Sequence, residues 1–528
     1  MARVSVSMGI DDAGAASKGL KSGALGLLSS IVMAIASTAP AYSLAATLGV
    51  VAIAVGIYSP AIMILAFLPM LFIAIAYQEL NQDHPDCGTT FTWAAKALGP
   101  RIGWMGGWGV IAADVIVMAN LAEVAGRYFY LLFGATALAQ DAFWVAVLGC
   151  IWIALMTWVC YIGIEVSARL QRWLVGIEVG ILLLFSVVAL VKVYSGNGTP
   201  GSIKPSWEWF NPFGIHSFSA FAQGTLVAIF IYWGWDTAVA VNEETEDKNR
   251  TPGRAAVIST VLLLVTYAVV TVAAQAYAGT GTTGLGLANE AHSGDVLSAL
   301  GYAVLGTTLG KLLIFMTLTS AAASSQTTIL PTARTTLAMA VYRAIPKVFA
   351  DIHPRYMTPT WSTIVMGVVS ITFYLGLTLV SDNVLADSIS SVGLMVAFYY
   401  GLTGFACVWY FRRTLFASFR NFLLRGLLPL IGSIVLLIAF MESARDMFSE
   451  NYGATSFMGI GGVFLIGAGT LLLGIVLMEL YRLRAPAYFR GEVLNASTQA
   501  MVTEEGEVVG SDEPTSNERL VEPSSRHS

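Results

Sequence analysis

Four acidic residues lie inside long apolar runs of this sequence: Asp114, Glu123, Glu178 and Asp236. A carboxylate surrounded by hydrocarbon is costly, so an acidic residue inside a membrane segment is a candidate functional group by default. Such a group can pair with a cation, help to coordinate a metal ion through oxygen, or take up and release a proton. Glu123 and Arg127 are one helical turn apart, so a local ion pair explains that pair without a functional role.

Two apolar runs are interrupted near their middles. In the run 217–241, Gly234 lowers helix propensity close to the costly carboxylate of Asp236. In the run 23–55, Pro40 lacks an amide proton and frees backbone groups near Ala36. In lipid those groups need a partner, which a bound substrate or ion can supply, so such breaks indicate the binding site of a transporter.

Each break also has a simpler interpretation. Gly234 could mark a close helix crossing, and Pro40 a proline kink in which Ser37 and Thr38 bond to their own helix. Because the two breaks lie five predicted spans apart, where an inverted repeat would place them, we favour broken helices.

The elements that would hold these groups are membrane helices. The chain has 528 residues, of which 56% are hydrophobic and 12% charged, about half the charged fraction of a soluble protein. Its apolar runs predict an all-α integral membrane protein with about twelve spans. We place them near 23–55, 60–80, 103–133, 142–162, 172–194, 217–241, 255–278, 306–332, 360–380, 389–411, 426–442 and 457–481.

The charge pattern predicts the orientation. Alternating loops from a cytoplasmic N-terminus place most of the 28 Lys and Arg on the cytoplasmic side, so we expect both termini there, in the cell membrane. Residues 1–22 show no cleavable signal peptide, and residues 483–528 are expected to be a disordered cytoplasmic tail. The four cysteines have no metal-ligand spacing and imply no disulfide. No nucleotide loop or metal set suggests an enzyme, a cofactor or a nucleic-acid partner.

Three stretches carry a resemblance to a known family. Residues 76–108 contain A-Y-Q-E-L, then P-D-C-G-T-T-F, L-G-P and G-W; span six reads F-I-Y-W-G-W-D-T followed by E-E-T; and residues 325–360 contain A-R, A-M, H-P and T-P in that order. Together they resemble a bacterial permease of the amino acid–polyamine–organocation (APC) superfamily, over about residues 20–480. The first span departs from the family's G-S-G or G-T-G pattern, since it reads Ala36-Ser37-Thr38-Ala39-Pro40.

The resemblance implies a LeuT-like fold with alternating access. Repeat one would cover about 23–194 and repeat two about 217–411, related as a 5+5 inverted repeat with broken helices 1 and 6. Two extra C-terminal helices would lie at about 426–482, completing a permease domain at 23–482. Substrate would bind at mid-membrane, its amino and carboxylate groups held by the unwound backbone. The residues so implied are Ala36, Ser37, Thr38 and Ala39, with Phe230, Ile231, Tyr232 and Trp233.

Five residues have more specific proposed roles. Phe230 matches the aromatic that closes over the ligand in relatives, although ordinary packing explains most membrane phenylalanines. Glu243 and Glu244 end span six, where they could pair with cytoplasmic basic residues as an inner gate or be solvated. Asp114 falls where relatives line the pocket and would favour ligands with a distal amine; the alternative is a polar helix–helix contact. We expect Asp236 to brace the broken helix.

Glu178 is the candidate coupling residue, and relatives that use protons often carry a Lys at the matching place. A lone carboxylate in an apolar environment favours its neutral form, so Glu178 could load and release a proton. It could instead complete a sodium site with the hydroxyls of Thr319 and Ser320. A third alternative is an ion pair with Arg169 or Arg172, which is awkward along one helix. We favour the proton over sodium.

We therefore expect a secondary active transporter that imports amino acids, with cationic amino acids or polyamines as candidate substrates, by proton coupling. The alternatives are an amino acid/polyamine exchanger, a sodium-coupled symporter, and a transporter-like sensor that binds without net transport. The remaining expected partner is membrane lipid.

Overall fold

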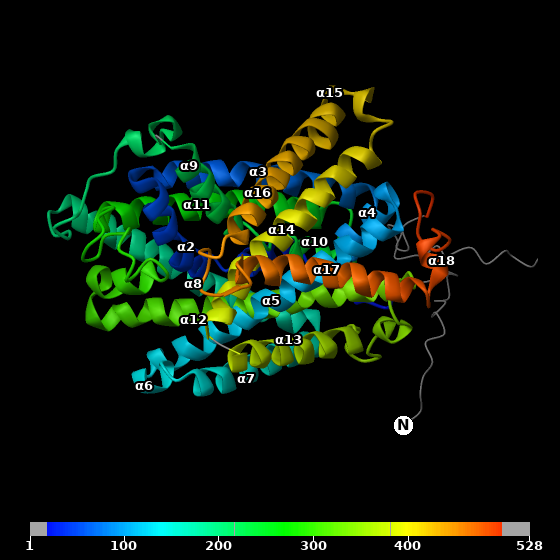
Figure 1. Cartoon of the computed structure of the whole chain (residues 1–528), viewed down its shortest axis with the longest axis horizontal. Coiled ribbons are helices and arrows are strands. Elements are labelled where there is room, and N and C mark those ends of the chain that lie inside the picture. Colours follow the sequence, from blue (N-terminus) through cyan, green and yellow to red (C-terminus); the bar gives the residue numbers. More distant parts are fainter. Residues whose placement is uncertain (1–17, 216, 381, 499–528) are drawn as a thin grey trace, which may run out of the picture.

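The chain folds almost entirely into helices. The structure is a computed structural model that describes residues 18–215, 217–380 and 382–498. Within those residues, the strands are β1 (Ser456–Phe457) and β2 (Ile460–Gly461), which pair antiparallel. The helical bundle is elongated, with most long helices running along its long axis (Figure 1).

The helices of the first half begin at an interrupted span. They are α1 (Leu27–Thr38), α2 (Pro40–Val55), α3 (Ser59–Asp83), α4 (Thr90–Leu98), α5 (Pro100–Leu132), α6 (Thr136–Ala139), α7 (Ala142–Tyr161) and α8 (Ile164–Tyr194). Those of the second half are α9 (Phe218–Phe230), α10 (Thr237–Ala240), α11 (Thr251–Ala278), α12 (Val296–Val341), α13 (Thr360–Val380), α14 (Asp382–Tyr410), α15 (Phe419–Asn421), α16 (Leu428–Phe448), α17 (Gly462–Arg482) and α18 (Pro486–Phe489). A short π-helix (Phe422–Leu427) joins α15 to α16.

Both predicted interruptions are present. Helix α1 ends at Thr38, and α2 begins at Pro40; between them Ala39 has φ = 45°, outside the right-handed helical region. Helix α9 ends at Phe230, turns follow, and α10 begins only at Thr237. Proline suits the first position of α2 because its missing N–H needs no partner there.

Ten stretches among the described residues are helical, long enough and apolar enough to cross a membrane. The stretch Leu27–Asp83 contains both the first and the second predicted spans, whereas the sixth appears as the 13-residue helix α9. Helix α12 is longer than predicted, since it runs from Val296 to Val341 with a kink at Gly306. The all-helical membrane class is therefore confirmed, while the count of twelve and the repeat remain predictions.

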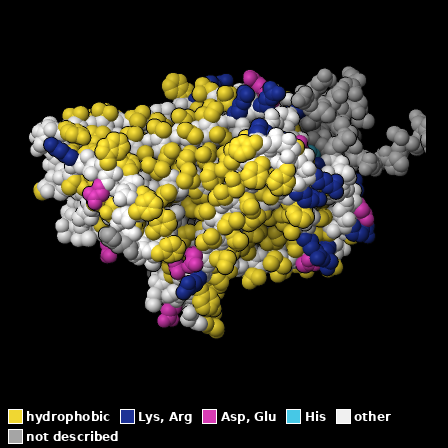
Figure 2. All heavy atoms as spheres, turned by 90° about the horizontal axis from the view of Figure 1, so that it is seen from above, with side chains coloured by type: hydrophobic (Ala, Val, Ile, Leu, Met, Phe, Trp, Pro, Cys, Tyr) yellow, Lys and Arg dark blue, Asp and Glu magenta, His cyan; other side chains and the backbone are white. Residues whose placement is uncertain are grey.

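The side of the helical bundle is largely apolar, as expected for a protein embedded in a membrane. Figure 2 shows a broad apolar face, with most of the visible Lys and Arg side chains toward the end that carries α18 in Figure 1. Helices α7, α13 and α17 each expose large apolar side chains along their length. Such a band suits lipid rather than water, and the chain is a multi-pass membrane protein.

The segment that follows α17 is ordered, which corrects the predicted start of the C-terminal tail. Residues 483–498 contain α18, and Tyr488 and Leu494 are buried beside Phe91 in an apolar cluster that also includes the end of α12. The Lys96 ammonium donates a hydrogen bond to the carbonyl oxygen of Thr498. The prediction for residues 499–528 lies outside the described residues.

Candidate functional site

The two interruptions meet at Ser37. The Thr237 hydroxyl donates to Ser37 Oγ at 2.8 Å, and the Ser324 hydroxyl of α12 donates to the Ser37 carbonyl oxygen at 3.1 Å. Gly234 has φ = 116°, and a Cβ placed on it would lie 2.7 Å from that same carbonyl oxygen. Only glycine permits both the backbone conformation and the contact. The site is therefore built where α1, the turn after α9 and α12 converge.

Asp236 braces this turn through two adjacent tyrosines of α14. Tyr400 donates to Asp236 Oδ1 at 2.8 Å and accepts from the Gly234 amide at 3.3 Å. Tyr399 donates to Asp236 Oδ2 at 3.1 Å and accepts from Nε1 of Trp233. Each oxygen of the Asp236 carboxylate thus accepts from a tyrosine hydroxyl, and that hydroxyl in turn accepts from an N–H group of the turn that contains Asp236. The expected bracing role of Asp236 agrees with these contacts, and the tyrosines are residues that we did not predict.

The four predicted binding residues of the second break face different surroundings. Tyr232 is buried, donates to the Met63 carbonyl oxygen at 3.0 Å and packs edge-on against Tyr267. The Ile231 carbonyl oxygen accepts from the Tyr267 hydroxyl at 2.8 Å. The ring of Phe230 is partly exposed and contacts that of Trp233, with 5.9 Å between centroids. Tyr232 is therefore part of the scaffold, and Phe230 and Trp233 form one aromatic pair.

Glu178 reaches the other break. Its side chain, from α8, is fully buried, and Oε1 accepts from the Ala41 amide at 2.7 Å and from the Ser320 hydroxyl at 2.7 Å. Oε2 has no hydrogen-bond partner among the described residues. Glu178 thus caps the first turn of α2, where a helix favours negative charge.

The alternatives for Glu178 can now be compared. Arg169 and Arg172 are exposed whereas Glu178 is buried, so the ion pair along α8 is wrong. Thr319 donates to its own helix at the Met316 carbonyl oxygen, 2.9 Å away. Of the two predicted hydroxyl partners, only Ser320 has a recorded hydrogen bond to Glu178.

Asp114 makes the polar contact between helices that was one of its two alternatives. Its Oδ2 accepts from the Thr332 hydroxyl of α12 at 2.6 Å, and it is 5% exposed. Glu123 and Arg127 form the expected local ion pair at 2.6 Å.

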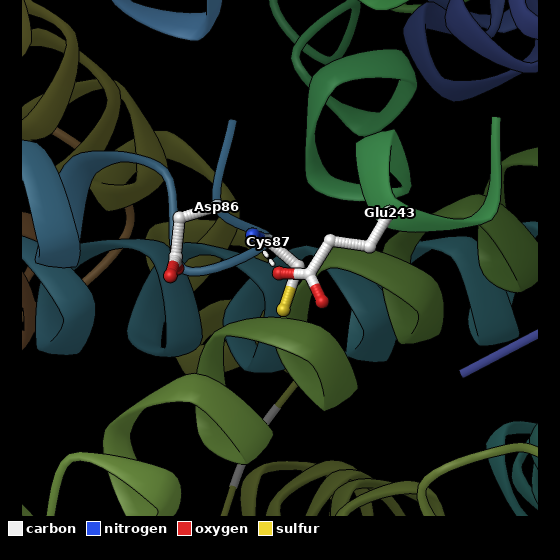
Figure 3. Close-up of side chains that lie close together, drawn as sticks. All are labelled: Asp86, Cys87 and Glu243. Carbon is white, nitrogen blue, oxygen red and sulfur yellow. Dashed lines mark hydrogen bonds between the residues drawn. The ribbon is translucent and has the colours of Figure 1, made fainter. Parts of the chain in front are cut away.

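Glu243 lies in a buried ionic cluster with Lys18 and Asp86. The Lys18 ammonium lies 2.6 Å from Glu243 Oε1 and 2.8 Å from Asp86 Oδ2. The Cys87 amide donates to Glu243 at 2.9 Å, as Figure 3 shows beside Asp86. Burial alone would lower the pKa of Lys18, but Asp86 and Glu243 raise it well above its ordinary value. Burial would likewise raise the pKa of Asp86, yet Lys18 holds it well below its usual range.

This cluster is not arranged for a metal ion. Ligand atoms of Asp86, Cys87 and Glu243 lie within 4.8 Å of one another, a spacing that could hold one. However, the Lys18 ammonium already supplies the positive charge, and burial raises the pKa of the Cys87 thiol, whereas a metal needs the thiolate.

Glu244 forms a second buried ion pair beside the first. Arg334 of α12 binds it through two hydrogen bonds, at 2.8 and 2.9 Å, and both side chains are fully buried. The predicted pairing of Glu243 and Glu244 with basic residues is present, and the solvated alternative is wrong. Leu25 adds backbone bonds of 3.0 Å to Glu244 and Glu246, so the N-terminal segment is bound to the same loop.

Buried interruptions in two apolar helices, with polar groups converging on them, define a multi-pass membrane protein of the transporter class. The family described as amino acid permease matches residues 25–465. The chain therefore belongs to the amino acid permease family, within the superfamily expected from its motifs.

Named relatives differ in substrate. The chain is 26% identical over 259 residues to the branched-chain amino acid permease BcaP of Lactococcus lactis, covering 46% of this chain and 53% of the relative. It is 24% identical over 336 residues to the low-affinity putrescine importer PlaP of Escherichia coli, covering 63% and 69%. It is 25% identical over 325 residues to the methylthioribose transporter of Bacillus subtilis, covering 58% and 65%. The match thus spans roughly half to two thirds of these relatives.

Proposed function

We propose that the chain is a secondary active transporter that imports an amino acid or a related small amine by alternating access. Family membership supports the transporter class. The observation that carries the rest is the direct meeting of the two interruptions at Ser37 and Gly234. Backbone groups outside regular helices can bind the charged ends of a substrate, so we assign the site to the two breaks.

The substrate class follows from this site and from the relatives. The proposed binding residues are Ala36, Ser37, Thr38 and Ala39 with Phe230, Ile231 and Trp233, while Tyr232 supports them from behind. The relatives' names include a branched-chain amino acid, putrescine and methylthioribose. We propose an amino acid, and Asp114 extends the choice to those with a distal amine.

Glu178 is the proposed proton-coupling residue. Its carboxylate caps α2 at Ala41, and a helix N-terminus attracts the charged form. Protonation would weaken that cap and allow α2 to move relative to α8. Both recorded partners donate to Oε1, an arrangement that suits a carboxylate held by hydrogen bonds more than one coordinating sodium.

Glu178→Gln tests the coupling because it keeps the shape and removes the charge. In proteoliposomes the variant should lose accumulation driven by a proton gradient but still exchange substrate for substrate. Ser320→Ala is the companion variant, since it removes one donor and leaves the carboxylate. If Glu178→Gln still concentrated substrate under a proton gradient without sodium, Glu178 would have no part in coupling.

Transport itself is tested by uptake into proteoliposomes. A thermal-shift screen of amino acids, putrescine and methylthioribose should first identify a ligand, because a ligand stabilises the state that it binds. Uptake that follows an imposed proton gradient supports the proposal. Uptake that requires sodium would instead indicate a sodium-coupled symporter. Uptake that requires substrate on the opposite side of the membrane would indicate an exchanger, and binding without uptake would indicate a sensor.

The ionic clusters at Glu243 and Glu244 are the proposed inner gate, with Phe230 closing from the opposite side. We further propose that the 5+5 repeat organises the spans and that both termini are cytoplasmic, which labelling of engineered cysteines in sealed vesicles can test.

A further inference from the structure

The connection between α14 and α16, residues 411–427, combines positive charge with exposed aromatic rings. Its basic residues are Arg412, Arg413, Arg420 and Arg425. Phe416 and Phe419 are 84% and 78% exposed, values unusual for phenylalanine in contact with water alone. The proposed transport mechanism uses none of these side chains.

Two of the four arginines share one carboxylate. Glu79 of α3 is buried and accepts from Arg425 at 2.6 Å and also from Arg420, whose side chain is 54% exposed. Arg412 and Arg413 are exposed, and neither pairs with a carboxylate in the part of the chain that the structure describes. The connection therefore keeps a positive charge.

The unpaired charge is placed beside aromatic rings. The Arg412 guanidinium lies over the ring of Trp409, 4.7 Å from its centroid, and donates to the Trp409 carbonyl oxygen at 2.7 Å. Trp409 is itself 50% exposed, and Phe416 stacks on Phe422 at 5.9 Å between centroids. Amphipathic rings next to cations are typical of the boundary between hydrocarbon and lipid headgroups.

The position of the connection agrees with that boundary. Helices α14 and α16 lead to α15 at the side of the bundle, in the half that also carries α4 and α18 (Figure 1). Seen from that side, the molecule presents its apolar face with basic side chains toward one end (Figure 2). The start of α16 continues the apolar surface with exposed Leu427, Leu430, Ile431 and Ile434.

We propose that residues 411–427 form a binding site for an anionic phospholipid. Arg412 and Arg413 bind the headgroup phosphate, to which the planar guanidinium fork is matched. Phe416 and Phe419 lie at the boundary with the acyl chains. Charge complementarity and continuity with the lipid-facing surface of α16 select this ligand over a protein partner.

The experiment compares the protein in nanodiscs of phosphatidylcholine with the protein in nanodiscs that also contain phosphatidylglycerol. Native mass spectrometry counts retained phosphatidylglycerol, and thermal unfolding measures its stabilising effect. Arg412→Gln/Arg413→Gln should weaken phosphatidylglycerol binding roughly 25-fold, at roughly 5-fold for each basic residue. Added salt should weaken binding to the parent protein, since the contact is partly exposed.

Arg355→Gln is the matched control, because Arg355 is exposed and also lies over a ring, that of Tyr356. It should bind phosphatidylglycerol like the parent. Equal binding by the double arginine variant, or no preference of the parent for phosphatidylglycerol, would overturn the proposal. A change of oligomeric state in the Phe416→Gln/Phe419→Gln variant would also overturn it, because it would mean that the two rings contact a second copy of the chain and not lipid. None of these results depends on transport, so failure here leaves the proposed function untouched.

Discussion

The Tyr400 hydroxyl joins Asp236 to the amide of Gly234, accepting from the amide at 3.3 Å and donating to the carboxylate at 2.8 Å. Two residues of one turn are therefore held by a side chain from another helix, α14. Any movement of α14 relative to this turn must break or carry along these bonds.

Tyr400→Phe should weaken binding of the best transported substrate without lowering protein yield. The substitution leaves an oxygen of Asp236 and the Gly234 amide without this partner, a loss of about 1–3 kcal/mol. The measurement is the substrate KM and maximal uptake rate, with Tyr194→Phe, on the exposed end of α8, as the control. Because the bonds form one network, Tyr400→Phe and Asp236→Asn should not be additive. Additive effects, or an unchanged KM, would contradict a positioning role.

Gly234→Ala should destabilise the protein and abolish uptake. Alanine at φ = 116° is strained, and its Cβ would meet the Ser37 carbonyl oxygen at 2.7 Å, with strain of this kind costing about 1–3 kcal/mol. Gly180→Ala in α8 is the control, since nothing lies within 4 Å of its added Cβ. A Gly234→Ala protein with the parent's unfolding temperature and uptake would show that the two breaks separate readily.

Lys18→Met should lower the free energy of unfolding by about 3–5 kcal/mol, the cost of leaving buried charges unpaired. Asp86 and Glu243 would both lose their cation. Lys21→Met is the control, because Lys21 pairs with Glu165 at the surface and such pairs contribute at most about 1 kcal/mol. Thermal unfolding in one detergent compares the two variants. Equal shifts in unfolding temperature would mean that the buried ion pairs of Lys18 contribute no more to stability than the surface pair of Lys21.

Acid should destabilise the protein through His84. Burial, and then the neighbouring Lys96, lower the pKa of His84 from 6.5 to about 3. Between these values the unfolded chain binds the proton and the folded chain does not, so stability falls as pH drops below 6.5. His84→Gln should remove this part of the pH dependence, whereas His292→Gln, at an exposed position, should keep it. Unfolding temperatures from neutral pH to about pH 4.5 measure the difference; parallel curves for parent and His84→Gln would refute it.

Asp114→Asn distinguishes a ligand-binding carboxylate from a structural one. If Asp114 binds a distal ammonium, ornithine or putrescine should bind more weakly by about 1–3 kcal/mol while neutral amino acids are unaffected. Competition uptake measures both classes of substrate in one preparation. An equal loss of binding for cationic and neutral substrates would mean that Asp114 has only a structural role, through its hydrogen bond with Thr332.

The sequence predicted those features that depend on local chemistry. Proline and glycine weaken helices through their own backbone chemistry, and the breaks near Pro40 and Gly234 lie where they were expected. Pairing of Glu243 and Glu244 with basic residues was one of two alternatives, and it is the one present. Their partners could not be named, because Lys18 is 225 residues away in sequence from Glu243 and was expected to belong to a polar N-terminal tail.

Other features depend on tertiary contacts without a local signal. Tyr399 and Tyr400 are apolar in a hydropathy pattern, and only packing shows that their hydroxyls face Asp236. The order of residues 483–498 depends on Tyr488 and Leu494 filling a cluster made by distant helices. The C-terminal boundary was therefore predicted too early.

The burial of Lys18 has a consequence for synthesis. Its partner Glu243 emerges from the ribosome 225 residues later, a delay of roughly 10 to 45 s at bacterial and eukaryotic elongation rates. Asp86 emerges 68 residues after Lys18, so for most of that interval Lys18 can have one of its two carboxylate partners but not the other. Synthesis of the first helices thus precedes completion of the Lys18 ion pairs, which needs Glu243 from the segment after α10.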